Sequence, residues 1–138
     1  MMNIGIKIAD DIIEEYTKLR MKREHRFMIL KVADDKENVV VDQIGARDAT
    51  FEDFKQQMPQ DEPRYAVFEI EFVGNAGNND SKILFILYVP DVSNSNLKFI
   101  YATSKDAVRK KVQPFHKELQ VNDWNDLDEE TFIKYFKH

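Results

Sequence analysis

The longest apolar run of the chain, Ile83 to Pro90, is the sequence feature that most limits its fold. The run is far too short to cross a bilayer, and its length is typical of a strand that is buried on both faces. The segment Arg64 to Val73 alternates between two faces, and the polar turn Gly74 to Asp80 joins it to the run. We therefore predict two strands joined by a hairpin turn, with Ser81 to Val89 at the centre of a sheet.

Helices and further strands are predicted around this pair. A helix is expected over 10–23, where apolar residues recur at roughly helical spacing, and the acid at its start and base at its end suit the helix dipole. A short helix is expected from Thr50, a residue type that caps helices well, to about Met58. The remaining elements are predicted as strands over 26–32, 38–44 and 117–121, a long helix from Ser93 or Ser95 to Val112, and a terminal helix over 128–137.

Strands and helices in this order predict an α/β protein of the α+β type, with a mixed central sheet of about five strands sandwiched by helices. The chain has 138 residues, the usual size of one domain. Hydrophobic residues make up 43% of it, which is enough to form a core, and there is no internal repeat to indicate a second unit. We expect a single domain over residues 1–138, and a monomer.

Several classes of function lack support in the sequence. The chain has no cysteine, which excludes disulfides, thiolate metal sites and a cysteine nucleophile. No two of the histidines, His25, His116 and His138, share helical ligand spacing, and no phosphate-binding or dinucleotide-binding glycine motif is present. No serine lies in a nucleophile elbow. We expect no catalytic residue, metal or cofactor, and an enzyme with an unrecognised site is the alternative from another class.

The formal net charge is −5, yet basic residues gather in two places, 18–26 and 105–117. Such a chain is not typical of a general nucleic-acid binder, and it suits contact with an acidic protein surface or an anionic lipid headgroup. The N-terminus has no long apolar run, so we expect no signal peptide, and the absence of cysteine suits the reducing cytoplasm. The basic group at 18–26 is interpreted as a solvated helix end, with a nuclear-import signal as the alternative.

The long helix carries the most informative pattern. At about 100° per residue, Lys105 and Arg109 fall within roughly 20° of Lys98, with Ala102 close by, and these cations form a basic stripe. A contiguous arc is expected to face the core: Leu97, Ile100, Tyr101, Ser104, Ala107, Val108 and Val112. Phe99 lies outside that arc, and an exposed aromatic beside a basic stripe is typical of an anchor for a protein partner. The alternatives are that Phe99 packs under the preceding loop and that the stripe is a solvated face.

At these residues the chain resembles the actin-depolymerizing factor/cofilin family. The segment Leu97–Ala107 reads LKFIYATSKDA, which is similar to the family's long-helix signature of a Lys-Met pair, a Tyr and then Ser-Lys-Asp-Ala. Gly5–Asp11, Thr50–Phe54, Arg64–Phe68 and Pro90–Asp91 match further family segments in the same order. The resemblance implies the ADF-homology fold, related to that of gelsolin, and a protein that binds actin monomers and filaments and promotes filament disassembly without hydrolysing ATP.

The resemblance also implies which residues bind actin, in monomers and filaments alike: Ile4, Gly5, Ile6, Lys98, Phe99, Ala102, Lys105 and Arg109. Phe99 takes the place of the family's Met, whose side chain would enter a cleft between two actin subdomains. Lys82, after the hairpin turn, and Lys134, in the terminal helix, match filament-side elements. A phosphoinositide headgroup, an inhibitory ligand of the family, could be held by a basic group at Lys105, Arg109, Lys110 and Lys111.

The chain departs from the family pattern at several positions. Family members are often inhibited by phosphorylation of a Ser beside the N-terminal Gly, but no serine precedes Gly5 and the first serine is Ser81. We therefore expect that control by this phosphate is absent. Basic residues are often found in the family at four positions where this chain has Asp80, Asn96, Tyr135 and His138. Filament contacts are expected to be weaker as a result, and severing is less expected than monomer binding.

Two groups of relatives are the alternatives within the same fold. Coactosin-like proteins bind filaments with little monomer binding, and glia maturation factors bind the actin-related branching complex. The monomer-binding residues from Lys98 to Lys105 argue against both.

Overall fold

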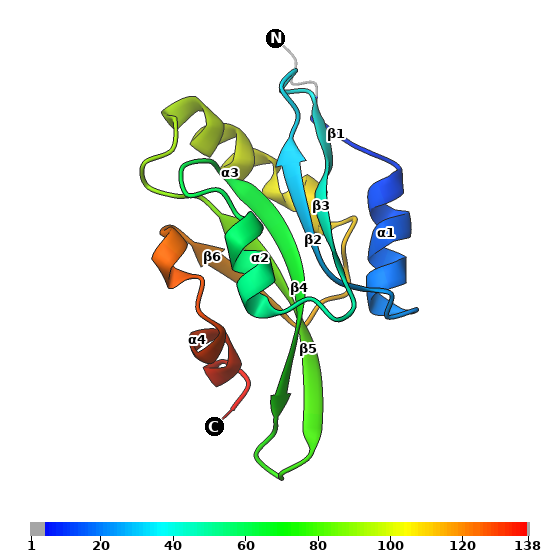
Figure 1. The fold of residues 1–138 in the computed structure, drawn as a ribbon. Coiled ribbons are helices and arrows are strands. Elements are labelled where there is room, and N and C mark those ends of the chain that lie inside the picture. The colour runs from blue at the N-terminus through cyan, green and yellow to red at the C-terminus, as the bar shows by residue number, and fades with distance from the viewer. Residues whose placement is uncertain (1–4, 138) are drawn as a thin grey trace.

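A six-stranded mixed sheet lies at the centre of the computed structural model, which describes residues 5–137 (Figure 1). The strands are β1 Lys7–Ile8, β2 His25–Val32, β3 Asn38–Ala46, β4 Arg64–Val73, β5 Asn79–Tyr88 and β6 Lys117–Val121. They lie side by side in the order β1-β3-β2-β4-β5-β6. Neighbours from β3 to β5 are antiparallel, whereas β1 and β6 pair in parallel with their neighbours at the two edges.

Helices cover both faces of this sheet. They are α1 Asp11–Arg20, α2 Phe51–Gln57, α3 Ser95–Arg109 and α4 Glu129–Lys134, with a short 3₁₀ turn, η1, at Trp124–Asp126. Helices α1 and α3 pack on one face, and α2 and α4 pack on the other (Figure 1). The predicted architecture is confirmed, with one strand more than the five or so expected.

The central strands are apolar on both faces because helices cover both faces. In β4, Tyr65 and Val67 join the core under α1 and α3, whereas Ala66 and Phe68 join the core under α2 and α4. This confirms the predicted alternation of β4, whose bounds also agree with the prediction. The apolar run in β5 is likewise buried.

The aromatic core under α2 restricts one position of β3. Phe27 is fully buried, and its ring lies 5.3 Å from that of Phe54 and 6.1 Å from that of Phe68, measured between centroids. Gly45 lies against this ring, and a Cβ built on it would be 2.1 Å from the nearest ring carbon of Phe27. Any side chain at Gly45 would therefore displace a ring from a close-packed core.

Thr50 caps α2 as predicted. Its hydroxyl accepts a hydrogen bond from the Asp53 amide at 3.1 Å, and the Asp53 carboxylate accepts one from the Thr50 amide at 2.8 Å. This reciprocal pair is a capping box, which satisfies two amides that the start of a helix leaves unpaired.

Several predicted helix bounds are wrong. Helix α1 ends at Arg20 rather than at residue 23, because Arg23 has a left-handed backbone with φ of 55° that cannot continue the helix. Helix α3 ends at Arg109 rather than at Val112, and α4 ends at Lys134 rather than at residue 137. Predicted strand ends differ from the observed ones by at most two residues.

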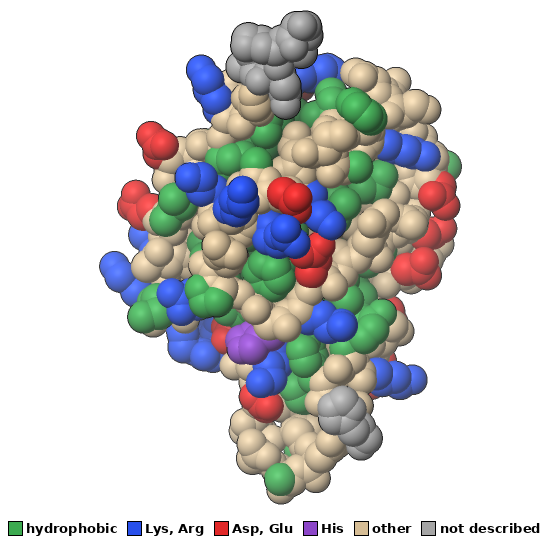
Figure 2. Space-filling model, turned by 180° about the vertical axis from the view of Figure 1, so that it is seen from behind, with side chains coloured by type: hydrophobic (Ala, Val, Ile, Leu, Met, Phe, Trp, Pro, Cys, Tyr) green, Lys and Arg blue, Asp and Glu red, His purple; other side chains and the backbone are tan. Residues whose placement is uncertain are grey.

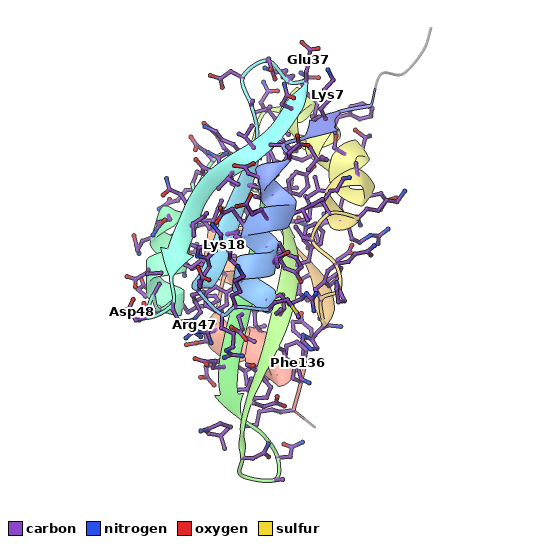
Figure 3. All side chains as sticks on the ribbon, turned by 90° about the vertical axis from the view of Figure 1, so that its right-hand side faces the viewer. Lys7, Lys18, Glu37, Arg47, Asp48 and Phe136 are labelled. Atoms are coloured by element: carbon purple, nitrogen blue, oxygen red, sulfur yellow. The ribbon has the colours of Figure 1, made fainter. Side chains whose placement is uncertain are left out.

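Strand β1 is the one strand of the described residues that the sequence pattern does not predict, because two residues carry no periodicity. The Lys7 amide donates to the Glu37 carbonyl at 2.8 Å, and the Ala9 amide donates to the Val39 carbonyl at 2.9 Å. Lys7 and Glu37 therefore lie together at one end of the molecule, and Phe136 lies toward the other end (Figure 3).

Candidate functional site

Helix α3 is fastened to the sheet by two buried tyrosines. The Tyr101 hydroxyl accepts a hydrogen bond from the Val32 amide at 2.8 Å, and the Tyr65 hydroxyl donates one to the Tyr101 carbonyl at 2.7 Å. Burial raises the pKa of both phenols, so they stay neutral near pH 7. At the start of the helix, the Asn94 side chain accepts from two amides of the first turn at 2.8 and 3.2 Å. These bonds fix which side of α3 faces solvent.

The core-facing arc predicted for α3 is confirmed. Its members are buried or half-buried: Leu97, Ile100, Tyr101, Ser104, Ala107, Val108 and Val112. Because this arc is held against the sheet and α1, the opposite side of the helix is left for a partner.

Phe99 projects from that opposite side. It is 67% exposed, so the alternative that it packs under the preceding loop is wrong. Val92 of that loop is itself 77% exposed, and Ala102, one turn after Phe99, is exposed as well. A large exposed aromatic with exposed apolar neighbours is typical of an interaction surface.

The cations of the basic stripe are held by other groups of the same chain. Lys98 Nζ donates to the Asp91 carbonyl at 2.5 Å, which draws its head group back over the loop before α3. Lys105 Nζ lies 2.7 Å from Glu118 Oε2, and Arg109 Nη1 lies 3.1 Å from Glu118 Oε1. The lysine, followed by the arginine, lowers the pKa of the Glu118 carboxyl. The stripe is therefore a paired surface rather than a row of bare charges.

Glu118 is a residue of this surface that sequence reasoning missed. It lies in β6, which was predicted as a strand with the bounds that the structure has. Nothing in that pattern places the strand beside α3, because the contact depends on the parallel pairing of β6 with β5. The only sequence signal is an acid within a strand that follows a basic helix.

The first described residues lie beside α3. Gly5 and Ile6 line a groove together with Ile100, Thr103 and Ser104 of the helix. Ile6 is half-buried and packs against the core under α3. The predicted contact residue Ile4 lies outside the described residues.

Lys110 and Lys111 line a groove to which Lys105 and Arg109 do not contribute. They line a hollow beside β1, with Ile6 among its other walls. Within residues 5–137, neither lysine has a carboxylate at salt-bridge distance. The four predicted phosphoinositide ligands therefore differ in their acidic neighbours, since Lys105 and Arg109 pair with Glu118.

The two filament-side lysines lie on β5 and α4. Strand β5 forms a projecting hairpin with β4 (Figure 1), and the Nζ of Lys82 on this strand is 4.0 Å from the Asp80 carboxylate. Lys134, at the end of α4, is exposed. The ring of Phe136, just after α4, stacks on that of Phe72 at 5.8 Å and joins α4 to the hairpin.

Exposed cations occur elsewhere on the surface. On the face seen from behind, Lys and Arg side chains are interspersed with acidic and apolar ones (Figure 2).

The part of the chain that the structure describes contains no group of three or more His, Asp or Glu side chains that could hold a metal ion. None of its helices has the length and apolar character required to cross a membrane.

Comparison with known proteins gives a consistent result. The family model described as cofilin/tropomyosin-type actin-binding protein matches residues 5–137. Actophorin of Acanthamoeba castellanii is 35% identical over 127 residues, which cover 92% of this chain and 91% of that protein. Actin-depolymerizing factor 3 of Arabidopsis thaliana is 36% identical over 128 residues, which cover 93% and 92%. The crystal structure of Plasmodium berghei actin depolymerization factor 2 matches with a TM-score of 0.85 and 25% identity, covering 98% of each chain.

Proposed function

The chain belongs to the family of cofilin/tropomyosin-type actin-binding proteins, which are regulators of actin rather than enzymes, and we propose that it binds actin monomers and filaments and promotes filament disassembly. The observation that carries this proposal is Phe99, a largely exposed aromatic on a helix whose other side is locked to the sheet. The names of the curated relatives, which include actin-depolymerizing factors, favour disassembly over binding alone.

The proposed monomer site combines the exposed side of α3 with the N-terminal segment beside it. Phe99 enters an apolar cleft of actin, and exposed Ala102 lets the helix approach closely. Gly5 and Ile6 extend this surface from the groove along α3. The cations of the stripe meet acidic groups of actin and fix the orientation of the complex.

The proposed filament-side contact consists of Lys82 and Lys134, at the end where the hairpin and α4 meet. Asp80 lies beside Lys82 and reduces its effective charge. This contact is therefore weaker than the monomer site, which favours accelerated subunit loss over efficient severing.

Disassembly requires no chemical step by this chain. A protein that binds one form of its partner better than another shifts the population toward the preferred form. The shift is limited by the ratio of the two affinities, and a reversal from 1:99 to 99:1 needs a preference of about 10⁴-fold. Nucleotide-dependent affinity for monomers and geometry-dependent affinity for filaments are therefore the quantities that determine activity.

The deciding experiment measures the affinity for ADP-actin and ATP-actin monomers beside the disassembly of preformed filaments, followed by light scattering and co-sedimentation. We expect binding to actin monomers and a faster loss of scattering, and the ratio of the two monomer affinities gives the nucleotide preference. Filament binding without faster disassembly would favour a coactosin-like activity. Binding to the actin-related branching complex instead of actin would favour a glia-maturation-factor-like activity.

Two further properties follow from the same proposal. The chain acts as a monomer in the cytoplasm, at the actin cytoskeleton. A phosphoinositide headgroup is held chiefly by Lys110 and Lys111, because acidic neighbours already pair with Lys105 and Arg109. In a flotation assay with phosphoinositide vesicles, replacing Lys110 and Lys111 by alanine should therefore reduce binding more than replacing Lys105 and Arg109.

A further inference from the structure

Glu118, on the edge strand β6, contacts two of the three cations of the basic stripe at once. Its Oε2 lies 2.7 Å from Lys105 Nζ, and its Oε1 lies 3.1 Å from Arg109 Nη1. Each carboxylate oxygen therefore serves a different cation. The side chains of all three residues are only 28–38% exposed, so the bridge is partly sheltered from solvent screening while the cations stay accessible to a partner.

The strand gives this carboxylate a fixed position. Strand β6 pairs with β5 along its whole length, and Glu118 lies opposite Phe85, which is fully buried. Its chain neighbour Leu119 points into the core under α2 and α4, so Glu118 points to the other face, toward α3. A short side chain on a paired strand thus anchors two long side chains on a helix.

The bridge does not use up the donors of the two cations. A lysine has three N–H donors and an arginine has five. Lys105 gives one bond to Glu118, and Arg109 gives one to Glu118 and one to Asp106 at 2.7 Å. Both head groups keep N–H groups that acidic side chains of a partner can accept.

Two effects of Glu118 on an acidic partner oppose each other. Its negative charge repels acidic groups, and at several ångströms through water and salt this lowers affinity by about two- to threefold. Its bridge orders Lys105 and Arg109 before binding, and ordering a long side chain on binding otherwise lowers affinity by roughly two- to tenfold for each. The ordering of two side chains is the larger effect.

We propose that Glu118 is a positioning residue of the actin-binding surface, which holds Lys105 and Arg109 in the arrangement that acidic groups of actin accept. The inference rests on the proposed function. It assigns a role in binding to an acid that itself has the wrong charge to attract actin.

The test is Glu118→Gln, which keeps the shape of the side chain and removes its charge. The affinity for actin monomers is expected to fall by about fivefold, as the ordering of both cations is lost. In a Lys105→Ala/Arg109→Ala background, the same substitution should no longer lower the affinity and should raise it by about two- to threefold, because only the repulsion between Glu118 and acidic groups is then left to remove. Thermal unfolding of each variant separates this coupling from a loss of stability.

Glu15 provides a matched control. Its carboxylate also bridges two basic side chains, with Lys18 Nζ at 3.3 Å and His25 Nε2 at 2.7 Å, but on α1. Glu15→Gln changes the net charge by the same amount and should leave the affinity for actin unchanged. A loss in this variant equal to that of Glu118→Gln would show that the loss is not specific to the basic stripe and would overturn the proposal.

The remaining outcomes also decide the matter. Binding by Glu118→Gln that is as tight as that of the wild type, or tighter, overturns the positioning role, and so does an equal loss in both backgrounds. A wild-type chain that fails to bind actin would overturn the proposed function instead, so the two failures are distinguishable.

Discussion

Substitution of Phe99 by alanine should nearly abolish monomer binding while leaving the fold unchanged. The ring is 67% exposed in the free protein, so its removal takes little from the core. Surface substitutions of this kind usually change the free energy of unfolding by no more than about 0.5 kcal/mol. The effect should therefore appear in binding and not in stability.

The size of the binding effect follows from the exposed area. Aromatic side chains bury roughly 150–250 Å² each, so about two thirds of that, roughly 100–170 Å², is left for a partner to cover. At about 25 cal/mol per Å², and after allowing for what alanine retains, Phe99→Ala should cost about 2–3 kcal/mol of binding free energy. That corresponds to a loss of affinity of about 30- to 150-fold.

The assay is a titration of labelled actin monomers with wild type and variant, beside thermal unfolding of both. Met21→Ala is the matched control, because Met21 is a large apolar residue exposed to nearly the same extent, 63%, on the segment after α1. It should bind like the wild type. A Phe99→Ala protein that unfolds normally and binds within about threefold of wild type would show that the exposed ring does not anchor the complex.

Two further predictions concern stability. Gly45→Ala should lower the free energy of unfolding by about 1–3 kcal/mol in denaturant titrations, because its Cβ would overlap the Phe27 ring. Gly74→Ala is the control and should be tolerated, because a Cβ there has no neighbour closer than 3.5 Å. Equal stability of the two variants would contradict this. Partial desolvation of the imidazole, aided by nearby Lys82, lowers the pKa of His116, so the folded state binds this proton less readily than the unfolded state. Stability should therefore decline as the pH falls below about 6.5. His116→Gln should flatten the melting temperature between pH 7 and pH 5.5, and an unchanged slope would exclude this source.

The elements with strong, two-sided patterns are those that the sequence predicts well. Arg64–Val73 and Lys117–Val121 agree in their bounds with the prediction, because alternation and apolar runs report directly which residues a sheet buries. Helix ends are predicted less well, because they depend on local backbone geometry. Arg23 ends α1 by adopting a positive φ, which an arginine does not signal in sequence.

The features of the candidate site also differ in how well the sequence predicts them. Exposure of Phe99 follows from helical geometry alone, since a wheel fixes its angle to the buried arc. The pairing of Lys105 and Arg109 with Glu118 does not follow from helical geometry, because Glu118 becomes their neighbour only when β6 joins the sheet beside β5. Angles within one element are local properties, whereas contacts between elements depend on topology.

The paired charges also limit what electrostatics can contribute to binding. Lys105 and Arg109 face Asp106 and Glu118 within the same chain, so the stripe carries much less net charge than its three cations suggest. Long-range attraction is then modest, and contacts at short range must determine affinity. Paired cations with ordered head groups can fix the orientation of a partner through their remaining N–H donors, but so close to Asp106 and Glu118 each such contact adds little free energy. The apolar area of Phe99 has no such internal competitor, and for this reason the affinity of the surface should depend chiefly on that ring.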